Sequence, residues 1–162
     1  MKLTVMTPLA IRIGAIPWMP RLLRQITATD KFIQRVSRGR VTILDIAGLP
    51  NLMLTVKGRK SGVPRTTPLL CVPYESGYLI AGSNFGGEKK PVWVVNVRAA
   101  EEKGELVGVR FEGQSHQAAV RELTGAERDH AWEHMIETWP NYARYAERTD
   151  RIIPVFLLDP AA

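Results

Sequence analysis

Residues 52–74 read LMLTVKGRKSGVPRTTPLLCVPY, and they predict two β-strands joined by a cationic turn. The runs 52–56 and 66–74 are rich in the β-branched and aromatic residues that favour strands. Between them, residues 57–65 hold four Lys or Arg side chains, two glycines and a proline. Because glycine permits positive φ angles, the backbone N–H groups of such a turn can converge on an anion. The turn is therefore either an anion site at a hairpin tip or a solvated loop with incidental charge.

Further strand-like stretches follow this hairpin in the sequence. They cover residues 77–85, 105–111, 114–123 and 152–158. Glu112 and Gly113 form a short turn between two of them, and Pro154 places the last one at a sheet edge or a bulge. Antiparallel strands in this order, with flanking helices between them, predict an α+β barrel.

A helix is expected to begin after Pro91. The N–H group that proline lacks is one that a helix start leaves unpaired, so proline suits the first turn. Lys89 and Lys90 precede this start. The free N–H groups and partial positive charge of a helix N-terminus attract anions, so this segment is a second place suited to a phosphate or carboxylate.

Thr124 and Glu127 have the spacing of a capping box, which predicts a helix that Pro140 interrupts. Aromatic residues spaced three apart cross this interruption, namely Trp139, Tyr142 and Tyr145. Residues three apart lie on neighbouring parts of one helical face. Such a stripe fits the core and fits a pocket wall equally well, because tyrosine and tryptophan combine an apolar ring with a polar group.

Length and composition favour one cytosolic domain. The chain has 162 residues, 45% of them hydrophobic, which suffices for a single core. Cys71 is the one cysteine and lies in a strand-like run, so no internal disulfide forms. We therefore expect a cytoplasmic protein.

The charge of the chain is concentrated at its amino end. Residues 1–40 contain eight Lys or Arg and one acid, whereas the rest has 14 against 15. This asymmetry favours a cationic arm over a protein that coats nucleic acid. A basic amphipathic helix is expected from Pro20 to Gly39, and no segment has the length of a membrane span or the form of a signal peptide. The helix either covers the barrel or attaches to an anionic membrane.

Metal and nucleophilic chemistry find little support. His130 and His134 share a helical face, but they lack an HExxH pattern and a third ligand, so a solvated face is favoured and no metal is expected. The serines lack a GxSxG context, and Cys71 lies in an expected core strand.

Three blocks in order, TVKGRKSGVPRTTPLL (55–70), AGSNFGGEKKPVWVVN (81–96) and YARYAERTDRIIPV (142–155), resemble the deazaflavin-dependent nitroreductase family. Members are small oxidoreductases of actinobacteria that use reduced coenzyme F420. Lys57 stands where the family usually has threonine. The resemblance implies an FMN-binding split-barrel-like fold over residues 41–162, preceded by the basic helical arm at 1–40.

The resemblance also implies site residues. Ser83, Tyr142 and Tyr145 would act on the acceptor, and Trp139 with both tyrosines would wall its pocket. Cofactor contacts would fall on Arg59, Lys60, Ser61, Arg65, Thr66, Thr67, Pro68, Leu69, Leu70, Ala81, Gly82, Ser83, Asn84, Val92, Trp93, Val94, Val95, Asn96 and Tyr142. Trp139 replaces a tyrosine of the family prototype, and Asn84 replaces a lysine. Of the properties that the resemblance implies, these two differences affect the choice of acceptor.

The implied activity is hydride transfer from reduced F420 to a small electron-poor acceptor, which is a quinone, an enone lactone or a nitroaromatic. The cations of the turn would bind the phosphate and oligoglutamate tail of the cofactor. One alternative is an FMN-binding split-barrel reductase. Another is a non-catalytic deazaflavin-binding protein at a membrane surface, which would lie on the inner face of the cell membrane. No nucleic acid partner is expected.

Overall fold

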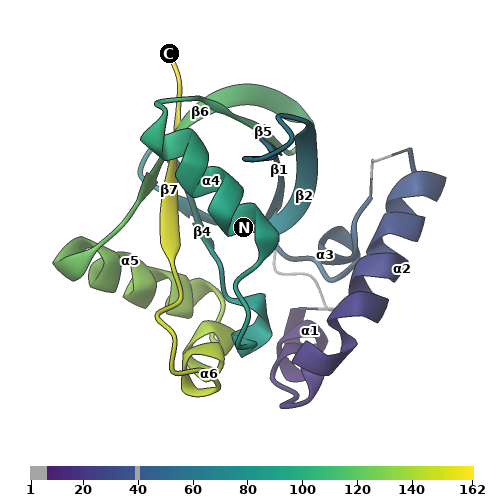
Figure 1. Ribbon diagram of the computed structural model, residues 1–162. Helices are drawn as coiled ribbons and strands as arrows, with labels where there is room; N and C mark the ends of the chain where they lie inside the picture. The colour runs from purple at the N-terminus through teal and green to yellow at the C-terminus, as the bar shows by residue number, and fades with distance from the viewer. Residues whose placement is uncertain (1–6, 39–40) are drawn as a thin grey trace.

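The computed structural model describes residues 7–38 and 41–162, which form a curled antiparallel sheet with helices around it (Figure 1). Seven strands follow the spatial order β2-β1-β5-β6-β7-β4-β3. Their bounds are β1 (Asn51–Lys57), β2 (Pro64–Leu70), β3 (Val72–Tyr74), β4 (Gly77–Ala81), β5 (Val107–Phe111), β6 (Gln114–Glu122) and β7 (Val155–Pro160). The expected α+β split barrel is therefore confirmed.

Helices cover this barrel on several sides. Those of the amino-terminal arm are α1 (Thr7–Gly14), the 3-10 helix η1 (Met19–Leu22) and α2 (Leu23–Val36). The remaining helices are α3 (Ile43–Ile46), the 3-10 helix η2 (Asn84–Gly86), α4 (Val92–Glu102), α5 (Gly125–Thr138) and α6 (Asn141–Glu147). In Figure 1, α4 crosses the barrel while α5 and α6 lie together at one end of it.

The first hairpin of the sequence is the first hairpin of the sheet. Val56 pairs with Arg65 and Lys57 with Pro64, so the cationic turn forms the tip. The apolar run after the turn does not form one strand, however. It divides at Cys71, whose N–H donates to the Pro50 carbonyl at 3.0 Å. Because β2 and β3 are the two edges of the sheet, this division joins one edge of the barrel to the other.

Two apolar cores hold the sheet and helices together. Phe156 and Leu158 of β7 face the barrel interior, where the buried residues of α4 fill the centre. Val155 and Leu157 face the opposite side and pack beneath α5 and α6. β7 thus buries both of its faces, which explains its almost continuous apolar sequence.

The last strand does not lie at an edge, so the position expected from Pro154 was wrong. β7 pairs with β6 on one side and with β4 on the other. Pro154 comes just before β7, and its carbonyl accepts from the Gly82 N–H at 2.9 Å. Because the proline stands outside the ladder, its missing N–H group costs the sheet no hydrogen bond.

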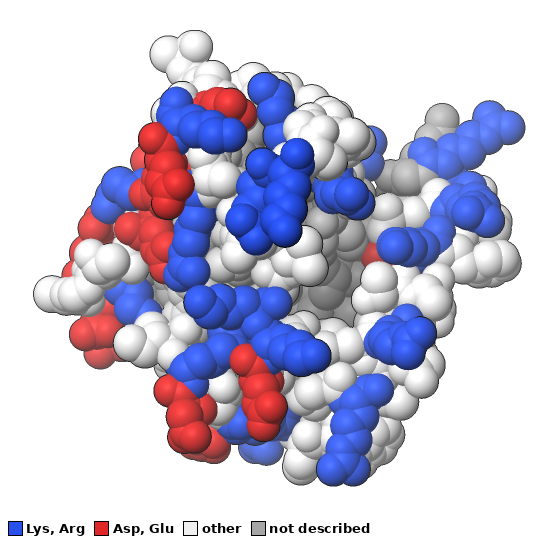
Figure 2. Space-filling view, viewed as in Figure 1, with Lys and Arg blue, Asp and Glu red and all other residues white. Residues whose placement is uncertain are grey.

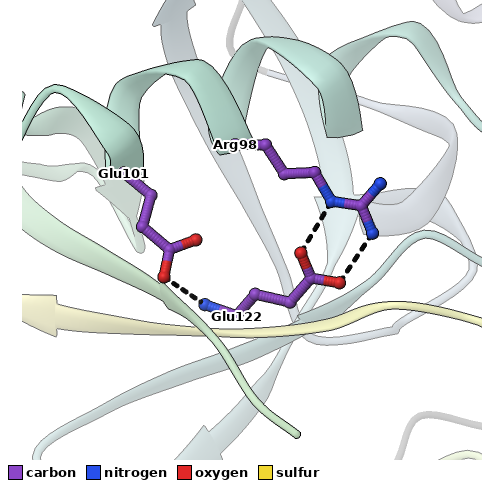
Figure 3. Close-up of polar contacts among 3 residues, drawn as sticks. All are labelled: Arg98, Glu101 and Glu122. Atoms are coloured by element: carbon purple, nitrogen blue, oxygen red, sulfur yellow. Dashed lines mark hydrogen bonds and ion pairs between the residues drawn. The ribbon is translucent and has the colours of Figure 1, made fainter.

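A charged contact fixes α4 against β6 (Figure 3). Arg98 donates from Nε and Nη2 to the two carboxylate oxygens of Glu122, at 2.6 and 2.7 Å. Glu101 accepts from the N–H of Glu122 at 3.0 Å. Bidentate pairs of this kind constrain orientation as well as distance. The contact therefore holds the carboxyl-terminal half of α4 against β6.

The capping box predicted at Thr124 was also wrong. The Thr124 side chain makes no capping hydrogen bond, and the Glu127 carboxylate, which would accept from the Thr124 N–H in such a box, is bound in bidentate fashion by Arg121 at 2.7 Å. A capping box does form at Thr42 and Asp45, at the start of α3. The helix expected after Thr124 is nevertheless present as α5.

The amino-terminal arm folds as separate helices that lie beside the barrel (Figure 1). The predicted basic helix is α2, and Gly39 lies outside the described residues. The Asp30 carboxylate is buried and accepts from the Ile43 N–H at 2.8 Å, which ties α2 to α3. Within the described part of the chain, no helix has the length and apolar character needed to cross a bilayer.

Candidate functional site

The turn between β1 and β2 presents three cations that form no ion pair within the described residues. Arg59, Lys60 and Arg65 are exposed and unpaired in this sense. Lys57 differs, since its Nζ lies 3.5 Å from a carboxylate oxygen of Glu105. Figure 2 shows Lys and Arg side chains gathered over the middle of the face that carries this turn and α4. The face is suited to a ligand with several negative charges.

The backbone of the turn is tight and is anchored to α4. Gly62 has a φ of 68° and donates to the Gly58 carbonyl at 2.7 Å. A Cβ atom at Gly58 would lie 2.6 Å from Ser61 Oγ, so the glycine allows the chain to fold onto itself. The Arg59 N–H donates to Asn96 Oδ1 at 3.0 Å, and Asn96 is buried. The turn is therefore held against the first turns of α4.

The start of α4 offers N–H groups. Pro91 is the N-cap residue, and no side chain caps the helix. Trp93 and Val94 are buried in the barrel core, where Trp93 meets Phe156 edge-on at 5.8 Å between ring centroids. A ligand at the helix start can therefore meet only the backbone of these two predicted cofactor residues. Val92 is 73% exposed and Val95 is half-buried, so their side chains are available.

The predicted residues of β2 divide between two faces. Arg65, Thr67 and Leu69 pair with residues of β1 that point into the barrel. Thr66, Pro68 and Leu70 point to the other side, where Thr66 shares a 2.8 Å hydroxyl contact with Thr55. Directly opposed residues of an antiparallel pair share a face, so the side chains of only one set can line a given site.

The loop after β4 approaches α4 closely. A Cβ atom at Gly82 would lie 2.7 Å from Val94 Cγ2, so glycine is needed for this approach. Asn84 and Phe85 both have left-handed φ angles, of 49° and 54°. The Asn84 side chain donates to the Lys89 carbonyl at 2.9 Å and thus braces its own loop. Ser83, half-buried, begins this loop beside the start of α4.

The aromatic trio lies in a core. Trp139, Tyr142 and Tyr145 are 5%, 2% and 3% exposed, so they do not line an open hollow in this structure. The rings of Tyr142 and Tyr145 meet edge-on at 6.1 Å, and Phe85 of the loop after β4 packs on Tyr145 at 5.7 Å. The loop that carries Ser83 and the aromatic trio are therefore in direct contact.

Helix α1 accounts for part of this burial. The Asn141 side-chain amide donates to the Ile11 carbonyl at 2.7 Å, and Arg148 donates from Nη2 to the Ala15 carbonyl. Gly14 lies so close that an added Cβ would be 3.0 Å from the Tyr145 hydroxyl and 3.1 Å from the Trp139 ring. The amino-terminal arm thus covers the aromatic trio.

A separate hollow of about 700 Å³ lies on the outside of the sheet. It runs between Gln34 of α2 and strands β1, β2, β5 and β6, and Thr66 is the one predicted cofactor residue among those that line it. Most predicted residues, including the cationic turn, the start of α4 and Ser83, lie elsewhere.

The histidines of α5 stand apart from the site. His134 Nε2 lies 3.1 Å from the Pro73 carbonyl of β3, while His130 is exposed. Within residues 7–38 and 41–162, no group of three or more His, Cys, Asp or Glu side chains is placed to hold a metal ion.

Burial shifts the protonation of three groups. It raises the pKa of the Cys71 thiol to about 12, with a smaller contribution from the charge of Glu112, so the thiol is not a nucleophile at neutral pH. Burial also raises the pKa of Tyr142 and of Tyr145 above the usual tyrosine value. Both phenols are therefore protonated at physiological pH and can donate a hydrogen bond.

Three hydrogen bonds to the loop after β4 were not predicted. They involve Arg148 and Arg151, which donate to backbone carbonyls of the loop after β4. Both arginines lie in the segment YARYAERTDR, where the sequence signals only charge. Their partners are more than 60 residues earlier in the chain, so no local pattern identifies them.

A curled antiparallel sheet of seven strands with helices around it is the architecture of the split β-barrel class. HutZ, a heme storage protein of Vibrio cholerae, superposes with a TM-score of 0.52 at 12% identity over 70% of this chain and 82% of its own, which shows the shared fold alone.

Closer relatives specify the family. The model of the F420H2-dependent quinone reductase family matches residues 26–160. An F420H2-dependent quinone reductase of Mycobacterium tuberculosis is 30% identical over 145 residues, which cover 87% of this chain and 95% of that protein. The solved structure of an F420H2-dependent reductase, FDR-A, has a TM-score of 0.61 at 37% identity, covering 68% of this chain and 94% of that one. A second solved structure, a domain-swapped dimer, has a TM-score of 0.63 at 32% identity, covering 82% of this chain and 99% of that one.

The chain belongs to the F420H2-dependent quinone reductase family. It is an oxidoreductase of the split-barrel class, and its cofactor is reduced coenzyme F420. The residues present fit this group. An anionic tail needs cationic or N–H donors, and both would come from the cations of the turn, which form no ion pair in the described part of the chain, and from the uncapped start of α4.

Proposed function

We propose that this enzyme transfers reducing equivalents from F420 to a quinone, with the cofactor tail bound at the β1–β2 turn. One observation carries the proposal. Arg59, Lys60 and Arg65 project without carboxylate partners in the described chain, next to a helix start that no side chain caps. Cations kept unpaired on a turn that Asn96 anchors are expected where a polyanion must bind.

The body of the site would be formed by the inner face of β2, the loop after β4 and the start of α4. Arg65, Thr67 and Leu69 would line one side with their side chains, and Trp93 and Val94 would contribute backbone N–H groups. Of the positions implied by the family resemblance, Thr66, Pro68 and Leu70 are the least suited, because their side chains point to the other face of β2.

Bound between these elements, the reduced cofactor would supply the hydride that the acceptor receives. The chain must then orient the acceptor and stabilise the negative charge that develops on its oxygen. We assign the Ser83 hydroxyl to that oxygen, since Ser83 begins the loop between α4 and the aromatic trio. Tyr142 and Tyr145, protonated and buried, would exclude water and offer hydrogen bonds. Trp139 would complete the wall, and the acceptor would reach the trio once α1 moves aside.

The test is a titration followed by turnover. Purified protein should quench the fluorescence of F420 on binding, and addition of menadione should then oxidise the reduced cofactor. A nitroaromatic and an enone lactone compared at equal concentration should be reduced more slowly. Absence of F420 binding would contradict the assignment. A yellow protein that oxidises nicotinamide donors would instead favour an FMN reductase.

We further propose that the arm attaches the enzyme peripherally to the cytoplasmic face of an anionic membrane. Phe32 and Val36 are 66% and 69% exposed on α2, next to the cationic stripe of Lys31 and Arg35, and Trp18 is 51% exposed. An exposed apolar stripe beside cations is typical of interfacial helices. The protein should sediment with vesicles rich in phosphatidylglycerol and not with pure phosphatidylcholine. Equal binding of a Phe32→Ser, Val36→Ser double variant would refute the proposal.

A further inference from the structure

The loop that carries Ser83 has a strained backbone. Asn84, Phe85 and Gly86 have consecutive positive φ angles of 49°, 54° and 79°. Glycine and asparagine tolerate this region, but phenylalanine does not, because its Cβ atom crowds the backbone. Strain of this kind persists only where the surrounding structure enforces it, and it is concentrated at functional sites.

Two arginines from the segment between α6 and β7 enforce it. Arg151 donates from Nε to the Gly87 carbonyl at 3.0 Å and from Nη2 to the Ser83 carbonyl at 2.8 Å. Arg148 donates from Nη1 to the Phe85 carbonyl at 3.2 Å. Three alternate carbonyls of one loop are thereby fixed by two neighbouring guanidinium groups.

Arg151 is poorly explained as a stabilising residue. Its remaining Nη1 is buried and has no hydrogen-bond partner among the described residues. It forms no ion pair with a described carboxylate, and burial lowers its pKa. A buried charged donor without a partner opposes folding. If the position served only for packing, an apolar side chain could be buried there at a lower free-energy cost than the Arg151 guanidinium.

We propose that Arg151 is a positioning residue for the reaction, which holds the Ser83 loop in the strained conformation that presents the Ser83 hydroxyl to the acceptor. The inference rests on the function proposed above for Ser83. The planar guanidinium group of Arg151 suits this positioning role, because two of its nitrogens, at a fixed spacing, bind two carbonyls at once. Lysine has a single ammonium group and cannot reproduce that geometry.

The experiment is a double-mutant cycle between Arg151→Met and Ser83→Ala, with menadione as acceptor. Because a misplaced catalytic group loses much of its effect, Arg151→Met should lower kcat on the order of 10- to 100-fold, which is more than it weakens F420 binding. In the Ser83→Ala background the same change should lower kcat less than about 3-fold, since the two residues act as one unit. Equal losses in the two backgrounds would overturn the inference.

Hydrogen exchange supplies a readout that needs no cofactor. The N–H groups of Gly86 and Gly87 donate to the Ser83 and Asn84 carbonyls, both at 2.9 Å. In Arg151→Met these amides should exchange at least about 10-fold faster, while those of β5 and β6 keep their protection. Unchanged exchange rates of the Gly86 and Gly87 amides would refute the proposal that Arg151 holds the loop. If the wild type oxidised no reduced F420, the proposed function would fail while this measurement still decided whether Arg151 holds the loop.

Two further variants guard against misfolding. Arg151→Lys retains the charge and should keep the fold, yet it should show most of the kcat loss. Arg144→Met is the matched control, because Arg144 is exposed on α6 and forms no ion pair with a described carboxylate. It should behave as wild type. Full kcat in Arg151→Lys would show that charge, and not the bidentate hold on the loop, is what matters, and so would refute the proposal.

Discussion

Replacing Gly14 by alanine should release α1 from the aromatic trio. A Cβ atom at this position would lie 2.7 Å from Asn141 Nδ2, the atom that donates to the Ile11 carbonyl. The Asn141 side chain cannot simply rotate away, because the residue is only 1% exposed. Its Oδ1 atom already lacks a hydrogen-bond partner in the described chain. The added methyl group must therefore displace either the amide or the helix.

The size of the effect follows from the hydrogen bond that the methyl group breaks. Leaving the buried Asn141 amide without its acceptor costs about 1–3 kcal/mol. Alanine gains up to about 1 kcal/mol of helix propensity over glycine, and less at a helix end. A net loss of about 1–2 kcal/mol in docking free energy remains, which corresponds to roughly a 5- to 30-fold larger open population.

Limited proteolysis measures that population. Arg12 and Arg21 are exposed, and trypsin should cleave there at a rate proportional to opening when the protease is scarce. Cleavage should accelerate about 5- to 30-fold in Gly14→Ala, while thermal unfolding of the barrel changes little. The KM for menadione should fall if α1 limits access. Ile13→Ala is the control, because Ile13 is 45% exposed on the same helix. Cleavage at the wild-type rate would refute the role given to Gly14.

Three further predictions concern the site and the core. Lys60→Ala and Arg65→Ala should each weaken F420 binding by about 1–3 kcal/mol through lost charged hydrogen bonds, whereas exposed Lys103→Ala should not; unchanged affinity in both would exclude the turn as the tail site. Ser83→Ala should lower kcat more than cofactor affinity, and parallel losses in fluorescence titration and turnover would contradict an acceptor role. Burial raises the pKa of Cys71 from 9.0 to about 12, so its contribution to stability is complete below pH 9 and is lost as the pH rises towards 12. Thermal unfolding should show this loss above pH 9, and Cys71→Ala should reduce the slope; an equal slope would argue against it.

The sequence predicted those parts of the fold that depend on local pattern. The hairpin at residues 51–70 could be read from β-branched runs around a glycine-rich turn, and α4 from Pro91. The capping box at Thr124 failed for an equally physical reason. Spacing identifies a pair that could cap a helix, but it does not reveal that Arg121 competes for Glu127.

For the same reason, only part of the arrangement around the candidate site could be predicted. Residues of the turn and of α4 are close in sequence to the signals that mark them. The cover that α1 forms over the aromatic trio depends on a contact between Ile11 and Asn141, 130 residues apart. Likewise, the hydrogen bonds from Arg151 to the Ser83 and Gly87 carbonyls join segments that are far apart in the sequence, so no local pattern predicts them.

The junction at Cys71 has a consequence for the shape of the barrel. Strands β2 and β3 are the two margins of one sheet, yet a single buried residue separates them along the chain. The ring is therefore closed by a covalent bond instead of by a ladder of hydrogen bonds. A circular permutant with its new termini at this point would keep all seven strands and lose the closure. The outer margins of β2 and β3 pair with no described strand, and without the link at Cys71 they could move apart and pair with strands of another copy, so such a permutant should assemble with further copies of itself.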